Sequence, residues 1–284
     1  MGIWIAAGIA TVLGILLVQW PIRRLSAPED RRMLLVAFLI ALPLQPLAFY
    51  VVRLPLHHAL EATLGNGPLL SSIGLFYAPL TEEPAKWLVL LLPFIRRAIT
   101  PRNALAFALA AGLGFGVGEY WFIASRIAVS PGGGAPFWMY GGFLVERLQT
   151  GFLHGAFILW FALALGEGRA PWMGGVIGMA LHFACNLPIV VISLDPFGLG
   201  AAFWLQMVSL WLIGLTLALL GALRRLARRE PGLELFGSST CPECAHVYPR
   251  PIVVAVNLGA TRLERCPACR HWHRVSSRPG KATA

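Results

Sequence analysis

Charged residues are scarce in this chain of 284 residues, at 13% of the sequence, whereas soluble domains carry about a quarter. Acidic residues are the scarcer kind, with 13 Asp and Glu against 23 Lys and Arg. Hydrophobic residues make up 57% of the chain and are spread along most of its length. This shortage of charge excludes one large soluble core, and we expect an integral membrane protein.

Long apolar runs take the place of the missing charge. A spanning helix needs about 20 mainly apolar residues. No basic residue precedes Ile3 and the first run reaches Trp20, so we expect a retained anchor helix rather than a cleaved signal peptide. The sequence predicts about seven transmembrane helices, at residues 2–20, 33–52, 69–95, 103–125, 142–165, 172–194 and 200–222.

The arginines indicate the orientation of these helices. Alternate connections are rich in arginine, and the opposite loops offer only Arg53 and Arg126. The positive-inside rule predicts a multi-pass protein of the cell membrane with its N-terminus outside and its C-terminus in the cytoplasm. Most of the net charge of +10 is explained by arginines that set the topology and face the headgroups of the lipid bilayer. No nucleic-acid partner is therefore expected. The arginine-rich stretches hold Arg23, Arg24, Arg31 and Arg32; Arg96, Arg97 and Arg102; Arg169; and Arg224, Arg225, Arg228 and Arg229.

Cysteine is also rare, and four of the five cysteines follow the last apolar run. Two Cys-x-x-Cys pairs separated by 21 residues are typical of a tetrahedral zinc site. Between them, the run 252–256 and a turn at 257–259 predict a β-hairpin. Two disulfides are the alternative, but they are rare in a reducing cytoplasm. The expected metal ligands are Cys241, Cys244, Cys266 and Cys269, with His271 and His273 expected to be exposed.

The expected fold is therefore an all-α polytopic membrane helix bundle with a small C-terminal β zinc ribbon. We expect a transmembrane domain at residues 1–229 and a cytoplasmic zinc-ribbon domain with its tail at residues 230–284. A structural zinc makes the ribbon an interaction or regulatory module.

A few ionisable residues fall at membrane depth, where each costs roughly 2.5–3.5 kcal/mol on insertion scales. At a rise of 1.5 Å per residue, Glu82 and Glu83 lie about 20 Å from the outer end of their helix. His154 lies about 18 Å from the outer side, and His182 about 15 Å from the inner side. These four residues thus converge near the middle of a hydrocarbon core about 30 Å thick. Such convergence indicates a functional site.

Other polar residues surround this level. Lys86 lies one turn after Glu82 and Glu83 and can compensate one carboxylate. Asn186 follows His182 by one turn, so both project from the same face of a helix. Glu119 and Arg147 fall at a similar outer depth, where a structural ion pair between their helices is an alternative to a catalytic role. Glu146 is expected at the solvated rim.

Three short motifs occur in order on successive apolar segments: Glu82-Glu83-Pro-Ala-Lys86 (EExxK), Phe115-Gly-Val-Gly-Glu119 (FxxxE) and His182-Phe-Ala-Cys-Asn186 (HxxxN). Residues 68–222, which hold them, resemble the PrsW family of intramembrane proteases, relatives of the type II CAAX prenyl endopeptidases. In the wider group the second motif usually ends in histidine, so Glu119 favours the PrsW branch.

The resemblance implies an intramembrane endopeptidase that hydrolyses a peptide bond of a membrane-anchored protein, for which an anti-sigma factor is the best-known kind of substrate. The catalytic candidates are Glu82, Glu83, Glu119, His154, His182 and Asn186. Either Glu82 or Glu83 is the expected general base toward a water held by His154 or His182, and Asn186 is expected to polarise the scissile carbonyl.

Active-site chemistry without a metal is the preferred interpretation, because the sequence contains no HExxH motif and the family resemblance implies glutamate chemistry without a metal. The alternative is a zinc ion held by two histidines and a glutamate. Two other classes of function stay open: a non-catalytic membrane scaffold that recruits a partner through its ribbon, and a proton-coupled transporter, for which no inverted repeat is evident.

Overall fold

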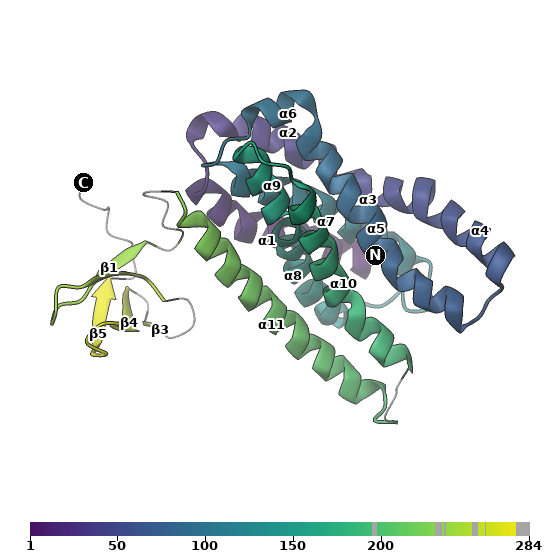
Figure 1. Cartoon of the computed structure of the whole chain (residues 1–284). Coiled ribbons are helices and arrows are strands. Elements are labelled where there is room, and N and C mark those ends of the chain that lie inside the picture. The colour runs from purple at the N-terminus through teal and green to yellow at the C-terminus, as the bar shows by residue number, and fades with distance from the viewer. Residues whose placement is uncertain (195–197, 231–234, 236, 252–254, 259, 277–284) are drawn as a thin grey trace. The chain divides into compact units, whose positions relative to one another are not determined.

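The computed structural model describes residues 1–194, 198–230, 235, 237–251, 255–258 and 260–276. The chain divides into two compact units, residues 1–223 and 224–284. The first is helical and the second contains the strands (Figure 1). The expected all-α membrane bundle with a small C-terminal β region is thereby confirmed.

All seven predicted segments form helices. They are α1 (Gly2–Arg24), a helical run through α2 (Arg31–Ala41), α3 (Leu44–Leu47) and α4 (Leu54–Leu64), then α5 (Pro68–Leu91), α7 (Ala104–Ala128), α8 and α9 (Gly141–Phe157 and Leu159–Gly166), α10 (Trp172–Leu194) and α11 (Ala201–Ala227). A short α6 (Pro93–Ala98) follows α5, and 3₁₀ turns at Pro28–Asp30 and Phe137–Tyr140 precede α2 and α8.

Five of these runs are long and apolar enough to cross a membrane, among the residues that the structure describes. They are Gly2–Arg24, Pro28–Leu64, Ala104–Ala128, Phe137–Gly166 and Phe203–Ala227. The protein is therefore a multi-pass membrane protein. Helices α5 and α10 have 24 and 23 residues, and their crossing of the membrane stays a prediction.

The second run is longer than the sequence predicts. A π-helical turn, Ala48–Arg53, links α3 to α4, so the helix continues from Pro28 to Leu64. The placement of Arg53 in an outer loop is therefore wrong, because Arg53 ends this π-helical turn within a continuous helix. An isolated π-helical turn inserts one residue into an α-helix and often lies at a functional site.

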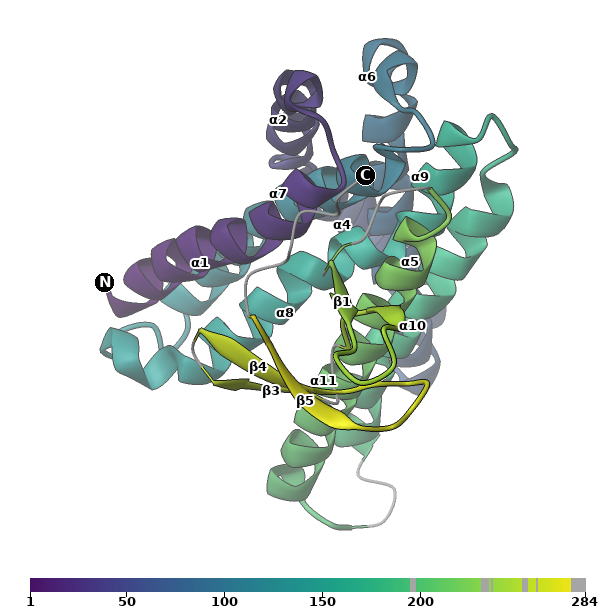
Figure 2. The same ribbon diagram turned by 90° about the vertical axis from the view of Figure 1, so that its left-hand side faces the viewer.

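Helix α7 is the core of the membrane unit. Its first 14 residues, 104–117, are all buried, as expected for a helix that is apolar on every side. It packs against α1, α2, α8 and α9. Figure 2 shows α1 running along α7 and α8, and Figure 1 shows α5 and α10 as neighbours.

Glycine allows the closest of these contacts. A Cβ on Gly112 of α7 would overlap the backbone of Gly155 on α8, and one on Gly155 would lie 2.9 Å from the Cα of Leu109. Backbones can approach this closely only where side chains are absent. The α7–α8 contact fixes the height of the residues on α8 relative to those on α7.

The second unit contains two antiparallel sheets. Strands β1 (Ser238–Thr240) and β2 (Val247–Pro249) form one, and β3 (Ala255–Leu258), β4 (Thr261–Arg265) and β5 (Trp272–Ser276) form the other. The predicted hairpin is present, but Asn257 and Leu258 pair with Arg262 and Thr261 inside the strands rather than forming the turn. The first part of the predicted strand, residues 252–254, lies outside the described residues.

Substitution of Gly112 by alanine is expected to destabilise the protein by about 1–3 kcal/mol, because the new methyl group must push α7 and α8 apart. The control is Gly8→Ala on α1, where a Cβ would meet nothing within 4 Å. We expect that control to be neutral or stabilising. Thermal unfolding of the detergent-solubilised protein measures both, and equal stability of the two variants would contradict the close packing.

Candidate active site

The acidic pair on α5 divides into two different environments. Glu83 and Lys86, one helical turn apart, are both 0% exposed. The Lys86 ammonium donates to Oε1 of Glu83 over 2.5 Å, and Nδ1 of His182 lies 2.6 Å from the same oxygen. The second oxygen of Glu83, Oε2, is buried and has no hydrogen-bond partner among the residues that the structure describes. One carboxylate oxygen thus joins α5 to α10.

A chain of polar contacts continues from Lys86 into α7 and α8. Nζ of Lys86 lies 3.1 Å from Nδ1 of His154, and Nε2 of that histidine lies 2.7 Å from Oε2 of Glu119. Oε1 of Glu119 lies 3.1 Å from Nη1 of Arg147. Arg147 also pairs with Glu146, whose side chain is 49% exposed, as expected at the rim. The Glu119–Arg147 ion pair therefore forms, and Glu119 also orients His154.

Glu82 faces a different set of partners. Its Oε1 accepts a hydrogen bond from Arg53, which also donates to Thr81 over 3.3 Å. Its Oε2 lies 3.8 Å from Nε2 of His182. The sequence pattern does not predict Arg53 as a site residue, because a positively charged residue after an apolar run is typical of a loop. The available signal was that apolar residues continue on both sides of it, with Val52 before it and Leu54 after it.

The buried charges in this cluster balance. A charge inside a membrane is tolerated when it pairs with an opposite charge, and losing one partner of a buried pair leaves an expensive uncompensated charge. Three carboxylates each meet a cation: Glu82 meets Arg53, Glu83 meets Lys86, and Glu119 meets Arg147, which also pairs with Glu146 at the rim. Arg53 is therefore the cation that compensates Glu82.

Aromatic rings enclose the centre of the cluster. The Lys86 ammonium lies 5.1 Å from the ring centroid of Phe115 and 5.5 Å from that of Phe157. Phe157 also stacks on the His182 ring, with centroids 5.1 Å apart and planes at 18°. Cation–π contacts of this kind stabilise a desolvated ammonium. The stacked ring also restricts the orientation of His182.

The two histidines differ in what their nitrogens can do. The Lys86 ammonium can only donate, so Nδ1 of His154 accepts and its Nε2–H donates to Glu119. Both nitrogens of His154 are therefore occupied. For His182, donation from Nδ1–H to the Glu83 carboxylate leaves the lone pair of Nε2 directed toward Glu82. These tautomers are assigned from the hydrogen-bond network.

The histidine and glutamate atoms do not converge as metal ligands. In the described part of the chain, the groups of three or more donors that lie close enough for one ion consist of cysteines alone. The Lys86 ammonium lies between Glu83 and His154, where an ion bound by both would lie. Asn186 is half-buried one turn beyond His182 and makes no side-chain hydrogen bond within the described residues.

The four cysteines of the second unit do converge. Their sulfur atoms lie within 4.8 Å of one another. The closest pairs across the two knuckles, Cys241–Cys269 and Cys244–Cys266, are 3.5 and 3.7 Å apart, well beyond a disulfide length of about 2.05 Å. The cluster can hold a metal ion, and the disulfide alternative does not fit.

The two knuckles have the same backbone geometry. Ala245 and Arg270 have positive φ angles of 56° and 62°, and each N–H donates over 3.0 Å to the carbonyl of the first cysteine of its knuckle. Burial raises the pKa of the Cys266 thiol, but backbone N–H groups of Cys269 and Ala268 outweigh it and lower the pKa to about 7. A thiolate is the form that binds a metal.

The ribbon histidines lie apart from this centre. His271 is exposed as expected, but the exposure expected of His273 is wrong. His273 is 6% exposed, and its Nε2 lies 2.7 Å from the Tyr248 hydroxyl. It therefore belongs to the packed interior of the ribbon.

Replacing Lys86 by methionine is expected to destabilise the protein by about 3–5 kcal/mol, because Glu83 is left buried without its cation. Adding Glu83→Gln to the same chain removes that charge and is expected to recover a large part of the loss. Thermal unfolding followed by tryptophan fluorescence measures this, with Arg97→Met on the exposed side of α6 as the control. No recovery in the double variant would contradict a buried ion pair.

Comparison with known proteins gives one match. Residues 29–213, well over half of the chain, match the model of the PrsW family, described as intramembrane metalloproteases. The search of curated proteins gave no match, and neither did the search of solved structures. The match supports a peptide hydrolase over the scaffold and transporter readings. The chain belongs to the PrsW family of intramembrane metalloproteases.

Proposed function

We propose that this membrane protease hydrolyses its substrate with a water activated between Glu82 and His182. The 2.6 Å contact between Glu83 Oε1 and His182 Nδ1 carries the proposal. That contact fixes the histidine so that Nε2 faces Glu82 Oε2 across 3.8 Å. A carboxylate that orients a histidine through Nδ1 and leaves Nε2 as the base is a recurring catalytic arrangement.

In this proposal the two glutamates have different roles. Nε2 of His182 takes one proton from the attacking water, while Oε2 of Glu82 accepts a hydrogen bond from the other hydrogen of that water. Nε2 then returns its proton to the departing amine. Glu83 acts as a positioning residue because both of the partners of its Oε1 are internal to the cluster. His154, with both nitrogens occupied, supports Lys86 rather than the water.

Asn186 is the proposed donor to the oxyanion. It lies one turn from His182 on the same helix, and its amide makes no side-chain hydrogen bond within the described residues. An amide N–H directed at the developing negative charge stabilises the tetrahedral intermediate. Glu119 is retained in the site as the residue that holds His154 and pairs with Arg147.

The family description implies a metal ion, but the membrane cluster as it lies does not fit one. Lys86 occupies the cation position between Glu83 and His154, and the described histidine and glutamate atoms do not gather around a common point. The proposed hydrolysis therefore proceeds through side chains alone. The metal of this chain is proposed to be a structural zinc in the ribbon, held by four thiolates.

The proposed substrate is a membrane-anchored protein, and the family resemblance suggests an anti-sigma factor as one such kind. The alternating arginine-rich connections support an N-terminus outside and a ribbon in the cytoplasm. The proposed division of labour assigns proteolysis to residues 1–229 and recruitment or regulation to residues 230–284.

The first test uses cleavage of a single-pass membrane reporter by purified protein in liposomes. Glu82→Gln and His182→Ala are each expected to lower the cleavage rate by about 100-fold or more, since each alters a group that activates the water. The matched control is Glu61→Gln on α4, because the Glu61 carboxylate accepts a hydrogen bond from Asn66 and has no contact with the cluster in the described part of the chain. Full activity in Glu82→Gln would exclude Glu82 from the activation of the water.

The second test counts zinc in the full chain by elemental analysis. We expect about one zinc per chain, held by the four cysteines. The Cys241→Ser/Cys244→Ser variant is expected to hold none and to keep its peptide-hydrolysing activity. A second zinc that survives this substitution and is lost in His182→Ala would contradict hydrolysis without a metal.

A further inference from the structure

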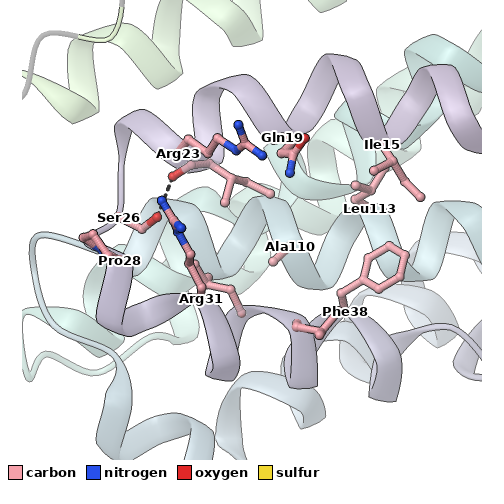
Figure 3. A pocket seen from close by; sticks show the side chains of 12 residues that line it. Ile15, Gln19, Arg23, Ser26, Pro28, Arg31, Phe38, Ala110 and Leu113 are labelled. Carbon is pink, nitrogen blue, oxygen red and sulfur yellow. Dashed lines mark hydrogen bonds between the residues drawn. The ribbon is translucent and has the colours of Figure 1, made fainter.

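A cavity of about 400 Å³ lies between α1, α2 and α7. None of the residues of the candidate active site line it. Helix α1, which forms one of its walls, precedes the matched residues 29–213, whereas α2 and α7 lie within them. Figure 3 shows its lining side chains.

One end of the cavity is polar and basic. Arg23 and Arg31 lie there with Ser26, beside the turn between α1 and α2, and Gln19 lies further in (Figure 3). Both arginines are exposed, and neither forms an ion pair in the part of the chain that the structure describes. Two guanidinium groups thus face the same opening with no protein carboxylate to neutralise them.

The turn before α2 holds two acidic residues, Glu29 and Asp30, and neither lines the cavity. Asp30 accepts a hydrogen bond from the side chain of Asn103 through Oδ1 and one from the N–H of Ala27 through Oδ2, each over 2.8 Å. The hydroxyl of Ser26 donates to the Ile22 carbonyl over 2.7 Å. The basic end therefore has an excess of positive charge that suits an anion.

The other end of the cavity is apolar. Ile15, Phe38 and Leu113 lie away from the arginines in Figure 3, and Leu34 and Leu35 also line the cavity. A free phosphate gains nothing from contact with an apolar wall, whereas a hydrocarbon chain is stabilised there by burial of its apolar surface. The arginines lie at the end of α1 and the start of α2, where a spanning helix meets the headgroup region of the bilayer.

We propose that this cavity binds one anionic phospholipid. Its phosphate contacts Arg23 and Arg31, which suit phosphate through planar, bidentate hydrogen bonding. One acyl chain lies along the apolar wall between α1, α2 and α7. A zwitterionic lipid presents a second, positive group to the same two arginines, so the cavity discriminates by net headgroup charge. This binding is independent of the proteolytic mechanism.

The test is lipid binding to the full chain in neutral detergent, measured by native mass spectrometry. The probes are phosphatidylglycerol, phosphatidylcholine with the same acyl chains, and inorganic phosphate. We expect phosphatidylglycerol to bind about tenfold more tightly than phosphatidylcholine, since each nearby arginine adds a favourable contact with an anionic headgroup. Inorganic phosphate is not expected to compete, because it lacks the chain.

Two double variants separate this cavity from the general charge of the turn. Arg23→Gln/Arg31→Gln is expected to lose the preference for phosphatidylglycerol. The control, Arg24→Gln/Arg32→Gln, removes the same charge from exposed neighbours that do not line the cavity and is expected to keep it. Leu35→Trp, on a side chain that is 56% exposed at the wall, is expected to weaken binding by narrowing the apolar end.

Three outcomes would overturn the proposal. Equal binding of the two lipids would mean that only annular lipid is present. Equal losses in the two double variants would assign the effect to the charge of the surface as a whole. Competition by inorganic phosphate, together with unchanged binding in Leu35→Trp, would mean that an anion binds without its chain.

Discussion

The ion pair between Glu83 and Lys86 is the constraint on which the membrane site depends. Neither side chain reaches water, and both lie on one helix that must pack among apolar neighbours. The contact between them uses only part of the hydrogen-bonding capacity of each group. The capacity that is left determines which other residues they contact. Glu83 takes His182 on α10, and Lys86 takes His154 on α8. Electrostatics thereby fixes which faces of three helices meet.

The rest of the cluster follows from that choice. His154 can accept from Lys86 only if its other nitrogen donates, and Glu119 receives that donation. Glu119 in turn holds Arg147, and on the other side Glu82 holds Arg53. The two sides of the cluster differ in the partners of their histidines. Both nitrogens of His154 contact protein groups, whereas Nε2 of His182 faces the Glu82 carboxylate across 3.8 Å. The proposed catalytic and structural roles are thus divided within one network.

The sequence predicts the parts of this site that depend on depth along a helix. Glu82, Glu83, His154 and His182 were expected at one level because a fixed rise per residue converts sequence position into height. The sequence predicts the cysteine knuckles equally well, because the geometry of each knuckle depends on residues that are close in the chain. The sequence does not predict which residues of neighbouring helices face each other. Whether His154 faces Lys86 or a water depends on how closely α7 and α8 approach. Gly112 and Gly155 set that distance. Arg53 was missed because composition alone cannot distinguish a charge in a loop from one paired inside a bundle.

The π-helical turn at Ala48–Arg53 has a consequence for how this site tolerates change in length. A π-helical turn holds one residue more than an α-helical turn, so the helix beyond it keeps its direction around the axis. Loss of one residue inside this turn would tighten it to an α-helical turn. Loss of one residue from the α-helix before it would instead rotate Arg53 by about 100° relative to the preceding residues. The ion pair of Arg53 with Glu82 therefore tolerates a deletion inside the π-helical turn better than a deletion in α3.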